Sequence, residues 1–281
     1  MSDIPDFQDL FRLDGKVALI TGGSRGLGLH TATAFLYAGA KKVILTSRKS
    51  GGTYGLNQAV ERLNKLPNIK GRALAIPADI SKTEEIQRLV KEVQKTESKL
   101  DILVANAGAA WGGPFDTTPD ASTVKVLDLN VRSIFNLIRI FTPLLEAAGT
   151  LSDPARVVIV SSTAGSHVPH VGEHGTIVYS ASKAAADHLA RNIAVELGPR
   201  HITTNSVAPG FFPSKLANGL IESLGGLEGL ERENPRRRLG VASDMAGVMV
   251  FLCSRGAAWI NGATIPVDGG GRLTAGRLSK L

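Results

Sequence analysis

The stretch Val17-Ala18-Leu19-Ile20-Thr21-Gly22-Gly23-Ser24-Arg25-Gly26-Leu27-Gly28 decides the fold of this chain of 281 residues. Its first five residues form an almost wholly apolar run, which is typical of a parallel strand buried on both faces. The glycines that follow allow a tight turn, a close approach of the backbone to a pyrophosphate, and close packing of a helix on the strand. Their spacing differs from the usual dinucleotide fingerprint. Even so, a position directly after the first strand favours nucleotide binding over a plain glycine-rich turn.

Short β-rich runs and helical patterns alternate along the rest of the chain. This alternation predicts an α/β fold with a Rossmann-type doubly wound parallel sheet of about seven strands and helices on both faces. The expected strands are residues 17–21, 42–47, 73–78, 102–105, 156–161, 203–207 and 264–267, and the expected helices include 29–38, 83–96, 122–148 and 180–197. We expect one domain, 1–281, with an N-terminal extension (1–13), a substrate-flap region (210–239) and a tail (272–281).

Composition excludes several classes of function. Hydrophobic residues make up 43% of the chain, but no apolar run is long enough to span a membrane. The net charge is +7, yet the basic residues are scattered, and the densest cluster is only Arg236-Arg237-Arg238. We therefore expect no nucleic-acid partner and attribute the charge to phosphate-bearing small molecules. The single cysteine, Cys253, excludes an internal disulfide and suits a reducing compartment.

Three histidines, His167, His170 and His174, lie in an irregular segment rich in glycine and proline. Their spacing fits no common metal site, and no cysteine or carboxylate pair accompanies them. We expect no metal and interpret these histidines as loop or substrate-lining residues, with their individual roles left open.

The end of the second expected strand indicates which cofactor binds. A site that prefers NAD places an acidic residue there to bind the ribose 2′-hydroxyl. This chain has Ser47 and Arg48 instead, and Arg48 with Arg25 of the glycine loop can hold a 2′-phosphate. We therefore expect NADP(H), the alternative being that both arginines are solvated surface charges.

Tyr179 and Lys183 stand four residues apart, so in a helix they share one face. A nearby cation favours the phenolate and lowers the pKa of a tyrosine, which tunes the phenol for proton transfer. The spacing is also common by chance in amphipathic helices, so the pair gains meaning only from the rest of the chain.

Along nearly its whole length the chain resembles the short-chain dehydrogenase/reductase family, because the motifs occur in the family's order. They are the 21–28 glycine loop, Asp79-Ile80, Ala105-Asn106-Ala107-Gly108, Asn130, Ser161-Ser162, Tyr179 with Lys183, Pro209-Gly210, and Asp268-Gly269-Gly270. The resemblance implies catalytic roles for Asn130, Ser162, Tyr179 and Lys183. The tyrosine protonates the developing alkoxide, and the serine hydrogen-bonds the substrate carbonyl. The lysine lowers the tyrosine pKa and binds the ribose, while the asparagine anchors a proton-relay water.

The resemblance also implies further cofactor contacts. Asp79 contacts adenine with Ile80 alongside, and Ser214 stands where the family often has a threonine near the carboxamide and phosphate. With the loop and the strand ends, the expected cofactor-binding residues are Gly22, Ser24, Arg25, Gly26, Leu27, Gly28, Ser47, Arg48, Asp79, Ile80, Asn106, Ala107, Gly108, Tyr179, Lys183, Pro209, Gly210 and Ser214.

Two departures from the family pattern bear on function. Ala105 replaces the first asparagine of the Asn-Asn-Ala-Gly motif, while Asn106 remains. The segment between Ser162 and Tyr179 is longer than is usual for the family and carries the three histidines. We expect it to reshape one wall of the substrate pocket.

The expected activity is NADPH-dependent reduction of a ketone, reversibly the oxidation of an alcohol. A 3-oxoacyl thioester or a related acyl or polyketide carbonyl is the first substrate expected. The alternatives are an enoyl or dienoyl thioester reductase, a reductase of a sugar or steroid ketone, and a catalytically silent NADP-binding scaffold or sensor.

The last three residues, Ser279-Lys280-Leu281, match a peroxisomal address that an import receptor reads at a free C-terminus. We expect a peroxisomal location if this signal is read, and a cytoplasmic one otherwise. The family resemblance further implies a homodimer or homotetramer formed through the two long helices that contain Asn130 and Tyr179.

Overall fold

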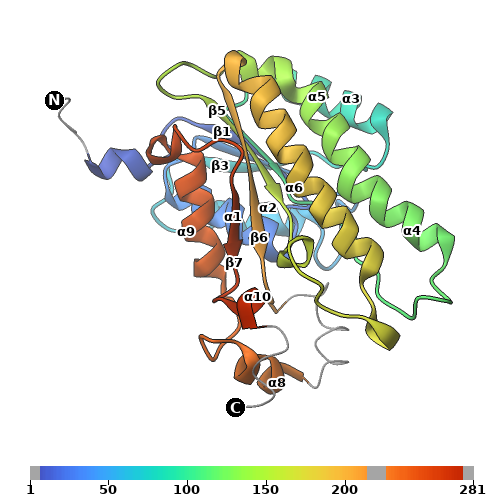
Figure 1. Cartoon of the computed structure of the whole chain (residues 1–281). Helices are drawn as coiled ribbons and strands as arrows, with labels where there is room; N and C mark the ends of the chain where they lie inside the picture. Colours follow the sequence, from blue (N-terminus) through green and yellow to red (C-terminus); the bar gives the residue numbers. More distant parts are fainter. Residues whose placement is uncertain (1–6, 214–225, 275–281) are drawn as a thin grey trace.

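Seven parallel strands form the central sheet of the protein (Figure 1), seen in a computed structural model that describes residues 7–213 and 226–274. The strand order is β3-β2-β1-β4-β5-β6-β7. The strands are β1 (Val17–Thr21), β2 (Lys42–Thr46), β3 (Arg72–Ala75), β4 (Ile102–Ala105), β5 (Ala155–Val160), β6 (Ile202–Pro209) and β7 (Thr264–Val267). The expected doubly wound parallel sheet is confirmed. Parts of the expected extension, flap and tail, together with Ser214, lie outside the described residues.

The direction of winding reverses between β1 and β4, which are neighbours in the sheet although they are distant in the chain. Connections leave these two strands toward opposite sides, so a crevice opens beyond their carboxyl ends. The glycine loop follows β1, and Asn106 follows β4. The glycine loop and Asn106, both expected from the sequence to bind the cofactor, therefore meet at the crevice.

Helices cover both faces of the sheet (Figure 1). One hydrophobic core lies between the sheet and α3 (Thr83–Gln94), α5 (Ser133–Glu146) and α6 (Ile177–Leu197). A second core lies between the sheet and α1 (Gly26–Tyr37), α2 (Leu56–Asn64) and α9 (Ala242–Cys253). Leu13, expected in the N-terminal extension, is fully buried in this second core. The remaining helices are α4 (Asp120–Leu127), α8 (Gly226–Glu233), α10 (Gly271–Thr274) and short 3-10 turns.

The expected long helix over residues 122–148 is interrupted. A π-helical turn, Asp128–Arg132, separates α4 from α5 and has the buried Asn130 at its centre. A π turn inserts one extra residue and turns the following side chains, and such turns are frequent at functional sites. Sequence periodicity does not distinguish this turn from a continuous helix.

Strand β3 ends at Ala75 rather than at the expected residue 78. Pro77 lacks the amide that a continuing strand would donate. The chain still follows β2 for a few residues, since Ile76 and Ala78 donate to the carbonyls of Leu45 and Ser47.

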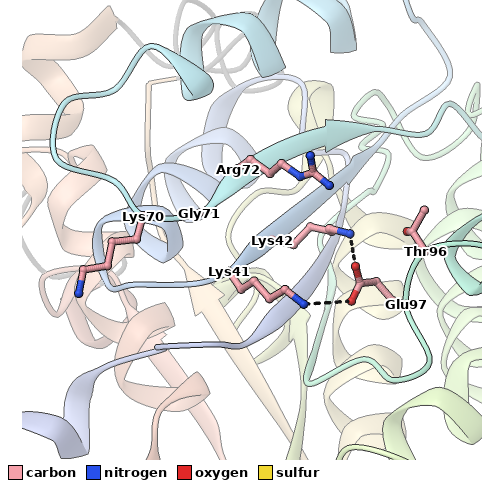
Figure 2. Close-up of a pocket in the computed structure, with 7 residues that line it drawn as sticks. All are labelled: Lys41, Lys42, Lys70, Gly71, Arg72, Thr96 and Glu97. Carbon is pink, nitrogen blue, oxygen red and sulfur yellow. Dashed lines mark hydrogen bonds and ion pairs between the residues drawn. The ribbon is translucent and has the colours of Figure 1, made fainter.

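A cavity of about 430 Å³ lies at the opposite, amino end of β2 and β3 (Figure 2). Its lining is mostly basic: Lys41, Lys42, Lys70, Gly71, Arg72, Thr96 and Glu97. The buried ion pair of Lys42 with Glu97 forms one wall, and Lys41 Nζ lies 4.0 Å from the second Glu97 oxygen. Removing one partner of such a buried pair costs about 3–5 kcal/mol, because the other charge is left without a counter-ion. These residues anchor an edge of the sheet far from the crevice.

No helix in the described part of the chain is long and apolar enough to cross a membrane.

Candidate active site

Two glycines of the loop lie so close to Asn106, after β4, and to the loop backbone that no side chain fits at either position. Gly22 has φ +65°, and a Cβ added there would lie 2.9 Å from Asn106 Nδ2. A Cβ on Gly28 would lie 2.5 Å from the carbonyl oxygen of Gly22. Both positions therefore require glycine, one for conformation and contact and the other for contact alone.

The first turn of α1 presents backbone amides that have no capping partner among the described residues. Arg25, at the N-cap, makes no side-chain capping hydrogen bond, and no acidic residue lies in the first turn. A Cβ on Gly26 would meet nothing within 4 Å, so this turn borders open space together with Ser24, Arg25 and Leu27. Free amides at a helix N-terminus bind anions. The loop therefore fits the pyrophosphate of a dinucleotide.

Asn106 and Thr21 connect the glycine loop to β4. The Asn106 side chain donates to the carbonyls of Thr21 (2.9 Å) and Gly22 (3.2 Å). In return, Thr21 Oγ1 accepts the amides of Asn106 and Ala107, both at 3.0 Å. Sequence reasoning named Asn106 and missed Thr21, whose only signal was a polar residue at the end of an apolar strand.

The expected ribose end of the crevice is basic. Ser47 and Arg48 follow β2, and neither Arg48 nor Arg25 has an ion-pair partner among the described residues. Asp79 uses Oδ1 to accept both the amide (3.1 Å) and hydroxyl (2.7 Å) of Ser81, and Ile80 is buried beside it. Two exposed guanidinium groups with no nearby carboxylate suit a 2′-phosphate.

Tyr179 lies in the first turn of α6 and faces the segment after β5. Its hydroxyl lies close enough to Ser162 for the serine side chain to lower the pKa of the phenol. The neighbouring Ser161 instead donates to the main-chain carbonyl of Lys183 at 3.1 Å. Of the two adjacent serines, Ser162 is therefore the one placed beside the tyrosine hydroxyl.

Lys183 lies one turn further along α6, and its ammonium is buried under the crevice. Nζ donates to the Val160 carbonyl at 3.0 Å and lies 5.7 Å from the centre of the Tyr179 ring. A Cβ on Gly108 would lie 3.5 Å from Nζ and 3.1 Å from Asn130 Oδ1, so a larger residue there would crowd Asn130. Burial lowers the pKa of Lys183 to about 8, opposed by the charge of Asp187.

Both polar groups of the Asn130 side chain make hydrogen bonds within the protein. Oδ1 accepts the Ala109 amide at 2.9 Å, while Nδ2 donates to the Ala109 carbonyl at 2.8 Å and to Ser182 Oγ at 3.0 Å. Ser182 in turn donates to the Tyr179 carbonyl at 2.7 Å. Asn130 thus connects the loop after β4 to the first turn of α6, which carries Tyr179. Ser182 was not singled out from the sequence, although it lies between the tyrosine and the lysine.

One expected effect is not found in the chain alone. The sequence predicted that Lys183 lowers the Tyr179 pKa, whereas burial raises this pKa above its usual value of 10.0, more than the Ser162 hydrogen bond lowers it. The physical reason is desolvation, because the phenol is buried and its charged form is disfavoured there, while the Lys183 ammonium donates to the Val160 carbonyl.

The histidine segment contacts the residues after β5 and after β6. His167 Nδ1 lies 2.7 Å from the Thr163 carbonyl, and the His170 ring centre lies 6.2 Å from that of Phe211, with the two rings tilted. Burial lowers the pKa of His170, reinforced by His167 and His174. Among the described residues, no three His, Cys, Asp or Glu side chains gather as a metal site.

The residues after β6 pack against the end of β7. Gly210 donates its amide to the Val267 carbonyl at 3.0 Å, and a Cβ there would lie 2.7 Å from Asp268 Cβ, so Pro209-Gly210 runs close against the end of β7. Ser214 lies outside the described residues. In the flap region, Arg238 pairs with Asp244, and Arg237 donates to the Arg232 carbonyl. These two arginines have local structural partners.

Comparison with known proteins gives consistent matches over nearly the full length. A family model described as Enoyl-(Acyl carrier protein) reductase matches residues 22–272. The rhamnolipids biosynthesis 3-oxoacyl-(acyl-carrier-protein) reductase of Pseudomonas aeruginosa is 36% identical over 263 residues, covering 94% of this chain and 98% of the relative. The 7alpha-hydroxysteroid dehydrogenase of Escherichia coli is 34% identical over 263 residues, covering 94% and 96%. A solved P. aeruginosa protein, in an active-site complex with NADP, has a TM-score of 0.85 at 36% identity and covers 94% of this chain and 99% of its own.

The raised pKa of Tyr179 can be measured directly because the chain has only three tyrosines. In the protein without added ligand, we expect the phenol of Tyr179 to titrate above its usual value near 10, since burial disfavours the phenolate. The ultraviolet tyrosinate signal of the unsubstituted protein minus that of Tyr179→Phe isolates this group. A difference titration below the usual value would contradict the expectation.

Proposed function

Because this chain belongs to the short-chain dehydrogenase/reductase family, we propose that it reduces a ketone at the Ser162–Tyr179 pair with NADPH as the hydride source. The chain is an oxidoreductase that acts on CH–OH and ketone groups. The observation that carries the residue assignment is the buried Lys183 ammonium 5.7 Å from the Tyr179 ring centre, with the tyrosine placed beside Ser162.

The cofactor is NADP(H). The unpaired amides at the start of α1 fit its pyrophosphate, and Arg25 and Arg48 fit its 2′-phosphate. When bound, NADPH supplies hydride to the carbonyl carbon. The family member solved in an active-site complex with NADP, at 36% identity, supports the same use of the crevice here.

The side chains complete the reaction as follows. Ser162 donates a hydrogen bond to the carbonyl oxygen, where negative charge develops as hydride arrives. Tyr179 transfers its proton to this oxygen, so that one hydride and one proton together convert the ketone to an alcohol. The Lys183 ammonium stabilises the tyrosinate left behind, and Asn130 holds the surrounding loop in place through Ala109 and Ser182.

We propose a 3-oxoacyl thioester or a related acyl or polyketide carbonyl as substrate. The P. aeruginosa relative, a 3-oxoacyl-(acyl-carrier-protein) reductase, supports this choice. The E. coli relative, a hydroxysteroid dehydrogenase, favours a steroid-like ketone as second candidate. The matching family model bears the description of an enoyl reductase, but reduction of a double bond does not require the Ser162–Tyr179 pair. An NADP-binding scaffold or sensor would have no need of this pair either.

Replacing Tyr179 by Phe removes the proton donor without changing the ring. We expect kcat to fall by about 10²–10⁴-fold, the usual contribution of a positioned acid, while NADPH affinity changes little. NADPH consumption with a panel of 3-oxoacyl thioesters, steroids and simple ketones measures this and also identifies the substrate class. Tyr37→Phe, at a half-exposed tyrosine of α1, is the matched control and keeps full activity. Near-normal turnover by Tyr179→Phe would exclude the mechanism.

The role of Arg48 predicts a change of cofactor preference. Arg48→Asp removes a charged partner of the 2′-phosphate and adds a carboxylate for a ribose hydroxyl. We expect KM for NADPH to rise roughly tenfold or more and KM for NADH to fall. Arg72→Asp makes the same charge change at the amino end of β3, far from the crevice at the carboxyl ends of the strands (Figure 2). It should leave both constants unchanged. Equal effects of the two variants would refute the assignment.

We further propose that Ser279-Lys280-Leu281 directs the protein to peroxisomes through an import receptor. The support is the match of this C-terminal triplet to the address. In a cell with peroxisomes, a fluorescent protein fused to the N-terminus should give puncta that become diffuse when residues 279–281 are deleted. Puncta that persist after deletion would dismiss the signal.

We also propose that the chain forms a homodimer or homotetramer through the face of α4, α5 and α6. Large apolar side chains remain exposed there, among them Val124, Leu127 and Phe135. Light scattering should give a multiple of the chain mass, and Phe135→Asp should lower it. A monomer at micromolar concentration would contradict this.

A further inference from the structure

Asp187 is a buried carboxylate that the proposed reaction does not use. It lies on α6 one turn beyond Lys183, just as Lys183 lies one turn beyond Tyr179, so the three side chains share one helix face. Lys183 is 5% exposed and Asp187 6% exposed. Carboxylates and ammonium groups are rarely buried to this extent unless an opposite charge stabilises them.

The surroundings of Asp187 offer hydrogen bonding but no contacting cation. Oδ1 accepts the Ser206 hydroxyl of β6 at 2.7 Å, and Oδ2 lies against the backbone at Gly165, where an added Cβ would be 3.0 Å away. Within the described chain, Asp187 forms no ion pair within 4.0 Å. The cation that its charge supports is Lys183, through space along the helix.

We infer that Asp187 is a positioning residue that keeps Lys183 in its ammonium form at neutral pH. The role rests on the proposed function, because the ammonium matters only if it stabilises the tyrosinate of Tyr179. Asp187 itself touches neither the substrate nor the cofactor. It acts from beneath the site, through the charge state of the lysine.

The electrostatic balance at Lys183 supports this role. Burial favours the neutral amine and brings the lysine pKa to about 8, and Asp187 is the charge that opposes this fall. Asp187 and Lys183 lie one helical turn apart on the same buried face, where a negative charge favours the ammonium form. Loss of the Asp187 charge therefore lowers the lysine pKa further.

Other charged groups packed around α6 are engaged elsewhere or lie at a distance. On the elements that contact α6, the π turn carries Asp128 and Arg132, which pair with each other. The 3-10 turn Gly198–Arg200 carries Arg200, which pairs with Glu146. Arg156 pairs with Asp153 at the start of β5, and β6 has no ionisable side chain. The remaining groups are His167 after the 3-10 turn Thr163–Gly165, bound to the Thr163 carbonyl, exposed Asp120 and Lys125 on α4, and Tyr179, His188, Arg191 and Glu196 on α6 itself.

The pH dependence follows from the sign of the effect. Ketone reduction needs the ammonium, so activity falls as pH rises through the lysine pKa. Removing the Asp187 charge lowers this pKa, so the alkaline limb of the profile moves to lower pH, while activity at acidic pH is retained. A purely structural role would reduce activity or stability at every pH and leave the position of the limb unchanged.

The test compares Asp187→Asn with Ser206→Ala in the full chain. Asparagine keeps the size of the side chain and an oxygen that accepts the Ser206 hydroxyl, so only the charge is lost. We expect the alkaline limb of kcat/KM for NADPH-dependent ketone reduction to move down by roughly one pH unit in Asp187→Asn. Ser206→Ala, which removes the hydrogen bond but leaves the carboxylate, should keep the limb of the unsubstituted enzyme.

An unmoved limb in Asp187→Asn, or an equal loss of activity across all pH values, would overturn the inference. If that variant does not fold, Asp187→Ser takes its place with the same expected shift, and Asp187→Glu should keep the original limb. Absence of ketone turnover in the unsubstituted enzyme would instead refute the proposed function. The two failures are therefore distinguishable.

Discussion

The hydrogen bonds of Asn130 are the interaction on which the arrangement of the site depends. One amide side chain binds both main-chain groups of Ala109 and the hydroxyl of Ser182, and so connects the loop after β4, the π turn and the start of α6. Because the Asn130 side chain is buried, water cannot replace these partners, and loss of any one leaves an unsatisfied polar group that costs about 1–3 kcal/mol. The position of Tyr179 relative to the crevice follows from this connection, since Ser182 also binds the Tyr179 carbonyl.

The two halves of the site are assembled by different kinds of constraint. The cofactor half depends on close backbone contact: Gly22 and Gly28 leave no space for a Cβ, and Asn106 binds the loop by its main-chain carbonyls. The catalytic half depends on burial of charge, with Lys183 and Asp187 enclosed between α6, β5 and β6. The first constraint can be recognised in the sequence from the positions of the glycines. The second exists only once the helix has packed on the sheet.

This difference explains how much the sequence could predict. The seven-stranded parallel sheet was predicted correctly, with β1, β4 and β7 at the expected bounds, because continuous apolar runs between glycines are a local signal. Helix α2 was missed, since only Leu56, Ala59 and Leu63 of its nine residues are buried and the periodic signal is short. The π turn was missed because one extra residue hardly alters an amphipathic pattern. The raised pKa of Tyr179 and the contacts of Ser182 and Thr21 arise from tertiary packing, which no single stretch of sequence encodes.

The missing side-chain cap at the N-terminus of α1 affects the stability of the folded chain. A helix without an N-terminal cap forgoes about 0.5–2 kcal/mol, and here the described residues supply no side-chain cap to the first turn. A dinucleotide whose phosphates bind the amides of this turn stabilises the folded state alone, because the unfolded chain has no such turn. At a hundred times its dissociation constant, such a ligand adds about 2.7 kcal/mol to the free energy of unfolding. Either redox form of the dinucleotide carries these phosphates, so the total cellular pool would then contribute to how long each molecule of this protein stays folded.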